Sequence, residues 1–290
     1  MGQQQPERWL AREHALPVGE NVLLMGVLNV TPDSFSDGGR FQDNDHAIDS
    51  ALEMVDEGAH ILDIGGESSR PGSHPVSLEE ELQRVVPIVG KLAGRVPVPI
   101  SVDTTKAEVA RQCLDLGAAI INDISALRHD PEMADVVRQY RAGLILMHMR
   151  GEPATMQLSP SYTDVIDDVC DFLRSRIEAA IAWGIDRERI AVDPGIGFGK
   201  RLQDNLTVLG QLSSLAGLGR PIVIGPSRKG FLGTLLGRPV LEREWGTAAA
   251  VAAAVLNGAH VVRVHAVAQM RDVVRVSQAI RAAGQRLPVQ

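Results

Sequence analysis

Cysteine is scarce in this chain, because only Cys113 and Cys170 occur among its 290 residues. Each stands among apolar residues at helical spacing, so we expect two buried, reduced thiols. Their number and spacing favour neither a disulfide framework nor a zinc site. Aromatic residues are also few, at 3% against 44% hydrophobic residues in total, and the predicted core is therefore mainly aliphatic.

An excess of basic residues is missing too, since the formal net charge is -7. Nucleic-acid-binding and anionic-membrane surfaces depend on such an excess, so we expect neither partner. No apolar run approaches the roughly 20 residues that cross a bilayer. The polar start MGQQQPERWLAREHALP lacks the hydrophobic region of a signal peptide. These absences predict a soluble, cytoplasmic enzyme.

Eight short apolar runs are present, and almost every one ends in polar residues. They fall at 22–26, 61–62, 99–102, 119–121, 144–147, 190–192, 222–224 and 261–264. Helices are predicted near 45–57, 78–93, 106–116, 131–140, 163–184, 203–215, 244–257 and 268–283. Ser77 and Glu80 form a capping box before the second of these helices.

This alternation predicts an α/β fold, a single (β/α)8 TIM barrel, which gathers its strand ends at one rim. A doubly wound sheet is the rival, but it usually has fewer strands and places its polar groups at one switch point. We expect one domain over 21–285 and a peripheral N-terminal extension over 1–20. The connections 30–44 and 67–76, after strands 1 and 2, exceed the usual βα loop and suggest mobile lids.

Cations form the first group of candidate site residues. Arg263 stands within a strand of valines, where an unpaired charge is costly. It could make an internal salt bridge to a barrel carboxylate. A phosphate ligand is favoured, because His265 follows on the same strand face and completes an anion clamp. The other cations expected near the rim are Arg70, Lys200, Arg228 and Lys229.

Carboxylates and amides form the second group. Asp103, Asn122 and Asp193 end three of the predicted strands, where each could also cap the following helix. A carboxylate that accepts two adjacent N–H groups suits the edge of a guanidine-like heterocycle. Asp63 and Asp123 remain open between structural hydrogen bonding and ligand contact.

Asn29 ends the first strand and offers one neutral oxygen, a weak Mg²⁺ ligand unless substrate phosphates supply the rest. Asn29 could equally turn the chain into its loop. For His148, a hydrogen-bonded core histidine is favoured over an active-site base. The chain has no GxSxG elbow and no plausible Cys/His pair, so covalent catalysis is not indicated.

Eight motifs together resemble the dihydropteroate synthase family, in the family's order and over about residues 22 to 282. They are MGVLNVTPDSFSDGG (25–39), DIGGESSRPG (63–72), SVDT (101–104), NDIS (122–125), LMHM (146–149), DPGIGFGK (193–200), SRKGFLG (227–233) and RVH (263–265). The first two are highly specific. The resemblance implies an enzyme of folate biosynthesis that joins 4-aminobenzoate to 6-hydroxymethyl-7,8-dihydropterin diphosphate, uses Mg²⁺ and releases pyrophosphate.

The resemblance also implies roles for individual residues. Those implied for the pterin are Asp103, Asn122, Ile124, Met147, Asp193, Phe198 and Lys229. Those implied for the diphosphate are Asn29, Ser69, Arg70, Arg263 and His265, with Asn29 as the magnesium ligand. Those implied for 4-aminobenzoate are Phe35, Pro71, Ser227, Arg228 and Lys229. The catalytic group implied is Arg263, His265, Lys229 and Arg70.

A homodimer through the last helices and a role as sulfonamide target are further implications of the resemblance. Ser69 stands where the family more usually has Thr, which leaves affinity for aminobenzoate and its mimics open. A pterin-binding methyltransferase domain is the alternative function, but it has no need of the cations around Arg263. A paralogue that binds pterin without turnover is the third hypothesis.

Overall fold

The structure is a computed structural model that describes residues 6–19, 21–30, 39–70 and 72–285. Eight parallel strands form its centre: β3 (Leu23–Asn29), β4 (Ile61–Gly65), β5 (Ile100–Asp103), β6 (Ile120–Asp123), β7 (Gly143–Met147), β8 (Ile190–Asp193), β9 (Val223–Ile224) and β10 (Val261–Val264). Their order is β8-β7-β6-β5-β4-β3-β10-β9. A parallel bridge between Val192 and Ile222 joins the two outer strands. The sheet therefore closes into the predicted barrel, and the doubly wound alternative is wrong.

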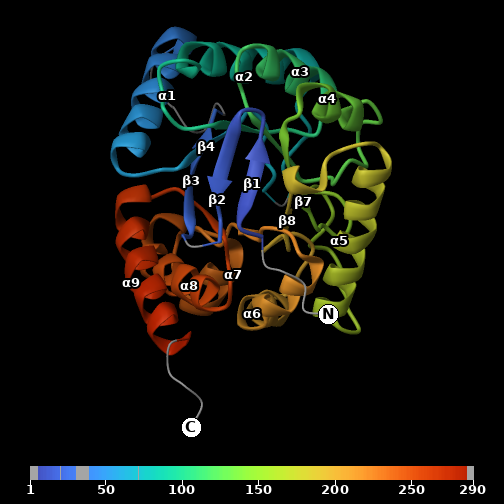
Figure 1. Ribbon diagram of the computed structural model, residues 1–290. Helices are drawn as coiled ribbons and strands as arrows, with labels where there is room; N and C mark the ends of the chain where they lie inside the picture. The colour runs from blue at the N-terminus through green and yellow to red at the C-terminus, as the bar shows by residue number, and fades with distance from the viewer. Residues whose placement is uncertain (1–5, 20, 31–38, 71, 286–290) are drawn as a thin grey trace.

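Helices surround the barrel on the outside (Figure 1). They are α1 (Gly39–Asp56), α2 (Leu78–Leu92), α3 (Ala107–Asp115), α4 (Met133–Tyr140), α5 (Val165–Ala182), α6 (Leu202–Gly210), α7 (Gly230–Leu236), α8 (Glu244–Leu256) and α9 (Val267–Gln285). Short 3-10 helices lie at Arg187–Arg189, Leu212–Leu218 and Val240–Glu242. The large apolar cluster between strands and helices is aliphatic almost throughout.

Three helices differ from the sequence-based expectation. The helix predicted at 203–215 is divided, because α6 ends at Gly210 and the 3-10 helix Leu212–Leu218 follows it. α1 begins at Gly39 rather than near 45, so the first long connection is shorter than predicted. Periodicity predicts no helix at α7, because GFLGTLL is short and contains two glycines. Ser77 does cap α2 by accepting a hydrogen bond from the Glu80 N–H at 3.2 Å. The Glu80 side chain pairs with Arg84 instead of completing the capping box.

Alternation along the strands decides what faces the barrel interior. Near the strand starts, one parity of residues forms an inner apolar cluster, which includes Met25, Ile61, Ile120, Ile145, Ala191, Val223 and Val261. On six of these strands, the residue two positions further along also faces the barrel interior. These residues are Asp63, Asn122, Met147, Asp193, Gly225 and Arg263. The interior is therefore apolar at the strand starts and mostly polar one layer nearer the strand ends.

A hairpin covers the N-terminal end of the barrel (Figure 1). β1 (Arg8–Ala11) and β2 (His14–Pro17) pair antiparallel. Trp9 is fully buried in the inner cluster, and its indole N–H donates to the Arg189 carbonyl at 2.8 Å. The expected peripheral extension over 1–20 thus differs from the structure at residues 8–18, because a large aromatic side chain there fills the barrel floor.

A third long connection, residues 148–164 between β7 and α5, runs along the same rim as residues 66–77 between β4 and α2. The two meet where the Gly72 N–H donates to the Pro153 carbonyl at 3.3 Å. Asp164 ends the connection as the N-cap of α5 and accepts from the Ile166 N–H at 2.8 Å.

Both cysteines are free thiols, as predicted, although Cys113 is buried and Cys170 only partly so. Burial raises the pKa of Cys113 to about 12, which keeps this thiol protonated and unreactive. Within the described residues, we find no helix with the length and apolarity that a membrane crossing requires.

Candidate active site

Arg263 lies at the centre of the polar layer. Its Nε donates to Asp63 Oδ2 at 2.6 Å, and one terminal nitrogen donates to Asp103 Oδ2 at 2.7 Å. The Asn122 amide also reaches Asp63 Oδ2, at 3.3 Å. Asp63 is fully buried, so these partners offset the cost of removing its carboxylate from water.

The structure thus gives Arg263 an internal salt bridge, the alternative that its sequence context favoured less than a phosphate ligand. Burial alone would lower the pKa of Arg263, but Asp63 and Asp103 outweigh it and keep the guanidinium charged. The ion pairs occupy Nε and Nη2, and Nη1 has no hydrogen-bond partner among the described residues. Contact with a ligand anion is therefore compatible with the salt bridge.

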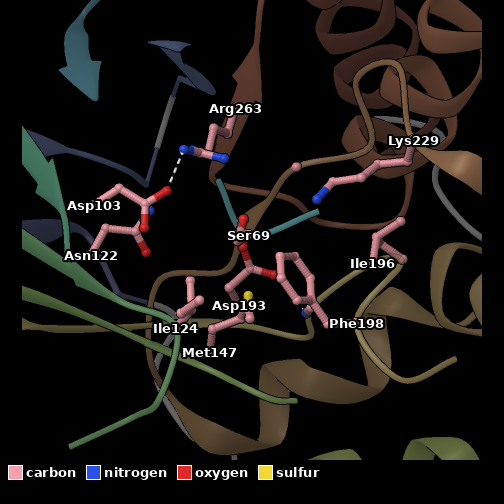
Figure 2. Close-up of a pocket in the computed structure, with 12 residues that line it drawn as sticks. Ser69, Asp103, Asn122, Ile124, Met147, Asp193, Ile196, Phe198, Lys229 and Arg263 are labelled. Carbon is pink, nitrogen blue, oxygen red and sulfur yellow. Dashed lines mark hydrogen bonds and ion pairs between the residues drawn. The ribbon is translucent and has the colours of Figure 1, made fainter. Parts of the chain in front are cut away.

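A cavity opens above this layer, on the C-terminal rim of the barrel. Figure 2 shows Asp103 and Asn122 to one side of it and Lys229 and Phe198 to the other. All seven residues expected to hold the pterin line this cavity, and so does Ser69. Those seven are Asp103, Asn122, Ile124, Met147, Asp193, Phe198 and Lys229.

The carboxylates in the cavity are poorly solvated. Burial raises the pKa of Asp193, opposed mainly by a hydrogen bond from the Gly195 N–H at 2.7 Å. Burial also raises the pKa of Asp103, to about 7, with Arg263 as the main opposing influence. Both carboxylates are therefore stabilised when a ligand offers them N–H donors.

Lys229 places its ammonium nitrogen 4.2 Å from the centroid of the Phe198 ring. Burial lowers the pKa of Lys229 to about 8, and the nearby charge of Arg263 is the second cause of this shift. The amine thus stands between an aromatic face and the carboxylates of the cavity. An anionic or carbonyl oxygen placed beside it would stabilise its charged form.

His265 lies beside Ser227 at the end of β10. The Ser227 hydroxyl and His265 Nδ1 are 3.0 Å apart. Burial, followed by Arg263, lowers the pKa of His265 to about 3, so the imidazole is neutral at pH 7. The predicted anion clamp consequently has one permanent charge, on Arg263, and one neutral donor.

Two further residues of the predicted diphosphate set stand nearer the surface. Arg70 is exposed in the connection after β4, close enough to lower the pKa of Lys229 and His265. Asn29 is the last residue of β3 and pairs in register with Gly65 of β4. The described residues contain no cluster of three His, Cys, Asp or Glu side chains that could hold a metal. A single Asn oxygen fits only a cation that brings its other ligands with it.

The predicted aminobenzoate residues are less completely defined. Phe35 and Pro71 lie outside the described residues, whereas Ser227 is buried. Arg228 directs its guanidinium to Glu244 of α8, and its backbone has a φ of 57°. Its side chain is therefore occupied by a helix contact, which differs from the expected border of the aminobenzoate pocket.

The residues left open by sequence are resolved by their contacts. Asp63 is the ion-pair partner of Arg263. It faces the barrel interior because it lies two positions after the interior residue Ile61 on β4. Asp123 accepts from the Ser125 and Leu127 N–H groups at 2.8 and 2.7 Å, so it shapes a turn. Lys200, expected at the rim, is 2% exposed. Its amine lies 2.9 Å from Nδ1 of His148, which is the buried, hydrogen-bonded histidine predicted.

Comparison with known proteins agrees with this geometry. A family model described as "Pterin binding enzyme" matches residues 25–265. A dihydropteroate synthase of Synechocystis sp. is 47% identical over 273 residues, covering 91% of this chain and 94% of that protein. The chain belongs to the dihydropteroate synthase family. Membership confirms the predicted dihydropteroate synthase, a transferase of folate biosynthesis, and favours it over the pterin-binding methyltransferase.

Two solved structures of the family are closely similar to this one. The Yersinia pestis dihydropteroate synthase in a sulfonamide drug complex has a TM-score of 0.90 and 41% identity, covering 95% of this chain and 99% of that one. The Burkholderia cenocepacia enzyme complexed with 7,8-dihydropteroate has a TM-score of 0.87 and 44% identity, covering 98% of this chain and 100% of that one. The barrel is therefore a family feature.

Proposed function

We propose that this chain condenses 6-hydroxymethyl-7,8-dihydropterin diphosphate with 4-aminobenzoate to 7,8-dihydropteroate and pyrophosphate. One observation carries the proposal: a single cavity combines the carboxylates Asp103 and Asp193 with the cations Lys229 and Arg263. A pterin diphosphate has a matching division, with N–H donors on the ring edge and negative charge at the other end.

The pterin ring occupies the inner part of the cavity in this proposal. Asp193 accepts the two adjacent N–H groups of the ring's guanidine-like edge, and Asn122 and Asp103 take the neighbouring donors and acceptors. Lys229 donates to the ring carbonyl. Phe198, Met147 and Ile124 supply the apolar surfaces, which they already form as one cluster.

The diphosphate lies toward Arg263, His265, Arg70 and Ser69. Charge-assisted hydrogen bonds from guanidinium groups suit phosphate oxygens, and the neutral His265 adds an N–H donor. Asn29 would hold Mg²⁺ together with the diphosphate oxygens. When bound, this cation neutralises negative charge on the leaving group.

Chemistry proceeds by departure of the leaving group. The bond between the pterin methylene carbon and the diphosphate oxygen breaks, and its electron pair leaves with pyrophosphate. The resulting cation is delocalised into the pterin, where Asp103 and Asp193 stabilise it. The aminobenzoate nitrogen then bonds to the methylene carbon and loses one proton to solvent. Electrostatic positioning of this kind needs no strong base.

Water would intercept that cation, so the connection after β4, which brings Ser69 to the cavity, closes over the site before bond cleavage. We infer ordered entry, with the diphosphate before 4-aminobenzoate, because the residues proposed to hold the pterin are mostly buried at the strand ends. Ser227 and Lys229 border the aminobenzoate in this proposal. Sulfonamides occupy the same place as mimics.

The protein acts as a cytoplasmic homodimer in this proposal. Large apolar side chains are exposed on α7, the 3-10 helix Val240–Glu242, α8 and α9, where monomers normally carry polar residues. They are Leu235, Leu236, Val240, Leu241, Trp245, Leu256, Val276 and Ile280, and Trp245 is 88% exposed. Two copies facing each other through these elements bury this surface.

The decisive experiment supplies pterin diphosphate, 4-aminobenzoate and Mg²⁺ and measures pyrophosphate and 7,8-dihydropteroate. Equal amounts of both products are expected. Methyl transfer from a methylated folate to a corrinoid protein, without pyrophosphate release, would instead support the methyltransferase. Pterin binding without any product would support the inactive paralogue.

A further inference from the structure

Residues 195–199, here called the glycine loop, carry Phe198 but contain no regular secondary structure. Gly195, Gly197 and Gly199 have φ of 69°, 82° and 61°, values that other residues rarely adopt. A Cβ on Gly195 would lie 2.0 Å from the His148 carbonyl oxygen. With no ladder or helix to fix it, this backbone takes its conformation from the groups around it.

Side chains from outside the loop bind most of its backbone polar groups. Lys200 donates to the carbonyls of Gly195 at 3.0 Å and Phe198 at 3.3 Å. Asn205 accepts from the Gly197 N–H at 2.7 Å. Lys200 and Asn205 follow the loop directly in sequence, so these contacts are local.

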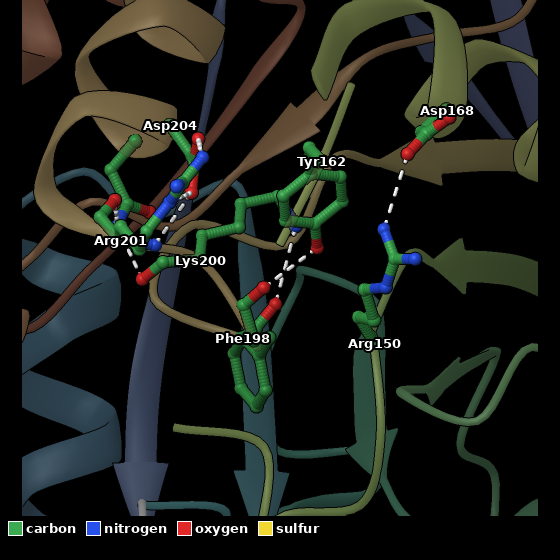
Figure 3. Close-up of polar contacts among 9 residues, drawn as sticks. Arg150, Tyr162, Asp168, Phe198, Lys200, Arg201 and Asp204 are labelled. Atoms are coloured by element: carbon green, nitrogen blue, oxygen red, sulfur yellow. Dashed lines mark hydrogen bonds and ion pairs between the residues drawn. The ribbon is translucent and has the colours of Figure 1, made fainter. Parts of the chain in front are cut away.

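Two further carbonyls of the loop are bound from another part of the barrel. Gln157 donates to the Gly197 carbonyl at 2.6 Å, and the Tyr162 hydroxyl donates to the Gly199 carbonyl at 2.7 Å. Figure 3 shows Tyr162 and Lys200 reaching the backbone next to Phe198. Both Gln157 and Tyr162 belong to the connection 148–164 that precedes α5.

That connection also touches the pterin pocket and the connection after β4. Met156 is buried against Met147, Met149 and Phe198. Pro153 accepts the Gly72 N–H, two residues beyond Arg70. One segment therefore joins the wall of the pterin cavity to the chain that bears a diphosphate residue.

We propose that Gln157 and Tyr162 are positioning residues for the pterin: their hydrogen bonds to the glycine loop hold the Phe198 ring in the orientation that receives the substrate. This rests on the proposed function for the identity of the ligand. Neither residue touches the reacting atoms. Their loss weakens pterin binding and leaves aminobenzoate binding unchanged.

The test compares Gln157→Leu, which removes the donor at similar size, and Tyr162→Phe, which keeps the ring contacts with His148 and Arg150. Each is expected to raise the KM for pterin diphosphate about fivefold, as for one hydrogen bond lost, and the double variant about 25-fold. The KM for 4-aminobenzoate and the melting temperature stay near wild type. Leu158→Ala, at an 82% exposed neighbour, is the matched control and should change nothing.

Gln157→Lys keeps an N–H donor of similar reach and should preserve the affinity. Fluorescence titration with an unphosphorylated pterin reads the same effect without turnover. Wild-type pterin affinity in the double variant, or equal rises in both KM values, would overturn the inference. A wild-type protein that binds pterin but makes no dihydropteroate would instead overturn the proposed reaction, and the titration would still test Gln157 and Tyr162.

Discussion

Arg263 donates from Nε to Asp63 at 2.6 Å, although the two residues are 200 positions apart in the chain. This pair crosses from β10 to β4 inside the barrel, with β3 between them. It fixes the guanidinium that lines the pterin cavity, and Asp103 holds its other side. The cation proposed to bind the diphosphate is thus kept in place by two carboxylates before any anion arrives.

Asp63→Asn should destabilise the protein by about 3 kcal/mol, because it leaves a buried guanidinium with one carboxylate fewer. Urea unfolding measures this. Asp168→Asn, which breaks the half-exposed pair with Arg150, is the control and should cost less than about 1 kcal/mol. Similar losses for both variants would mean that the Arg263–Asp63 pair contributes no more than a surface pair.

Arg70→Gln should weaken binding of pterin diphosphate about tenfold to 100-fold, the effect of one charge-assisted hydrogen bond lost. Binding of the pterin without phosphate should not change. Calorimetric titration with both ligands separates the two cases. Arg95→Gln, an exposed site beyond the end of α2, serves as the control. Equal weakening for both ligands contradicts a phosphate role for Arg70.

Asp193→Asn should weaken both pterin forms at least about 30-fold, since an amide cannot accept two adjacent N–H groups with one oxygen. The melting temperature should change little, because the amide oxygen still accepts the Gly195 N–H. Direct binding of the unphosphorylated pterin is the measurement. Undiminished affinity would remove Asp193 from the pterin site.

Lys229 gives the reaction an alkaline limit. Its pKa of about 8 lies below that of a free lysine, so its charge is complete well below pH 8 and is lost as the pH rises through it. The kcat/KM for pterin diphosphate should therefore fall about tenfold between pH 7 and pH 9. In Lys229→Arg the fall should move to higher pH. A profile identical to wild type would assign the limit to another group.

Trp245→Glu combined with Leu241→Glu should yield a monomer, because two charges replace exposed apolar side chains on the proposed interface. Sedimentation velocity reports the change in mass. Leu158→Glu places one charge at an equally exposed position on the connection 148–164 and should remain dimeric. A dimer that survives the double variant would place the interface elsewhere.

Local sequence patterns were sufficient to predict the eight strands and the polar residues at their carboxyl ends. Parity put Arg263 and His265 on one face, and apolar runs put Asp103, Asn122 and Asp193 at strand ends. All three of these carboxylate and amide side chains line one cavity. This works because strand alternation and parallel strand closure depend on spacing alone.

The short α7 and the hairpin β1–β2 were harder to predict. The hairpin has four residues in each strand, and its burial depends on the barrel floor that Trp9 enters. The hydrogen bonds that Gln157 and Tyr162 donate to the glycine loop could not be predicted from the sequence either. Their acceptors are backbone carbonyls, which no side-chain pattern reveals.

The amino-acid sequence by itself determined the barrel fold, the class of enzyme and the set of side chains at the barrel rim, because these follow from periodicity and motif. Only the tertiary structure decided how those side chains are paired and charged. Arg263 pairs with Asp63 and Asp103 from other strands of the barrel, and burial keeps His265 neutral. The ion-pair partners and the protonation state of a side chain depend on distances and desolvation in the folded protein, and local sequence patterns specify neither.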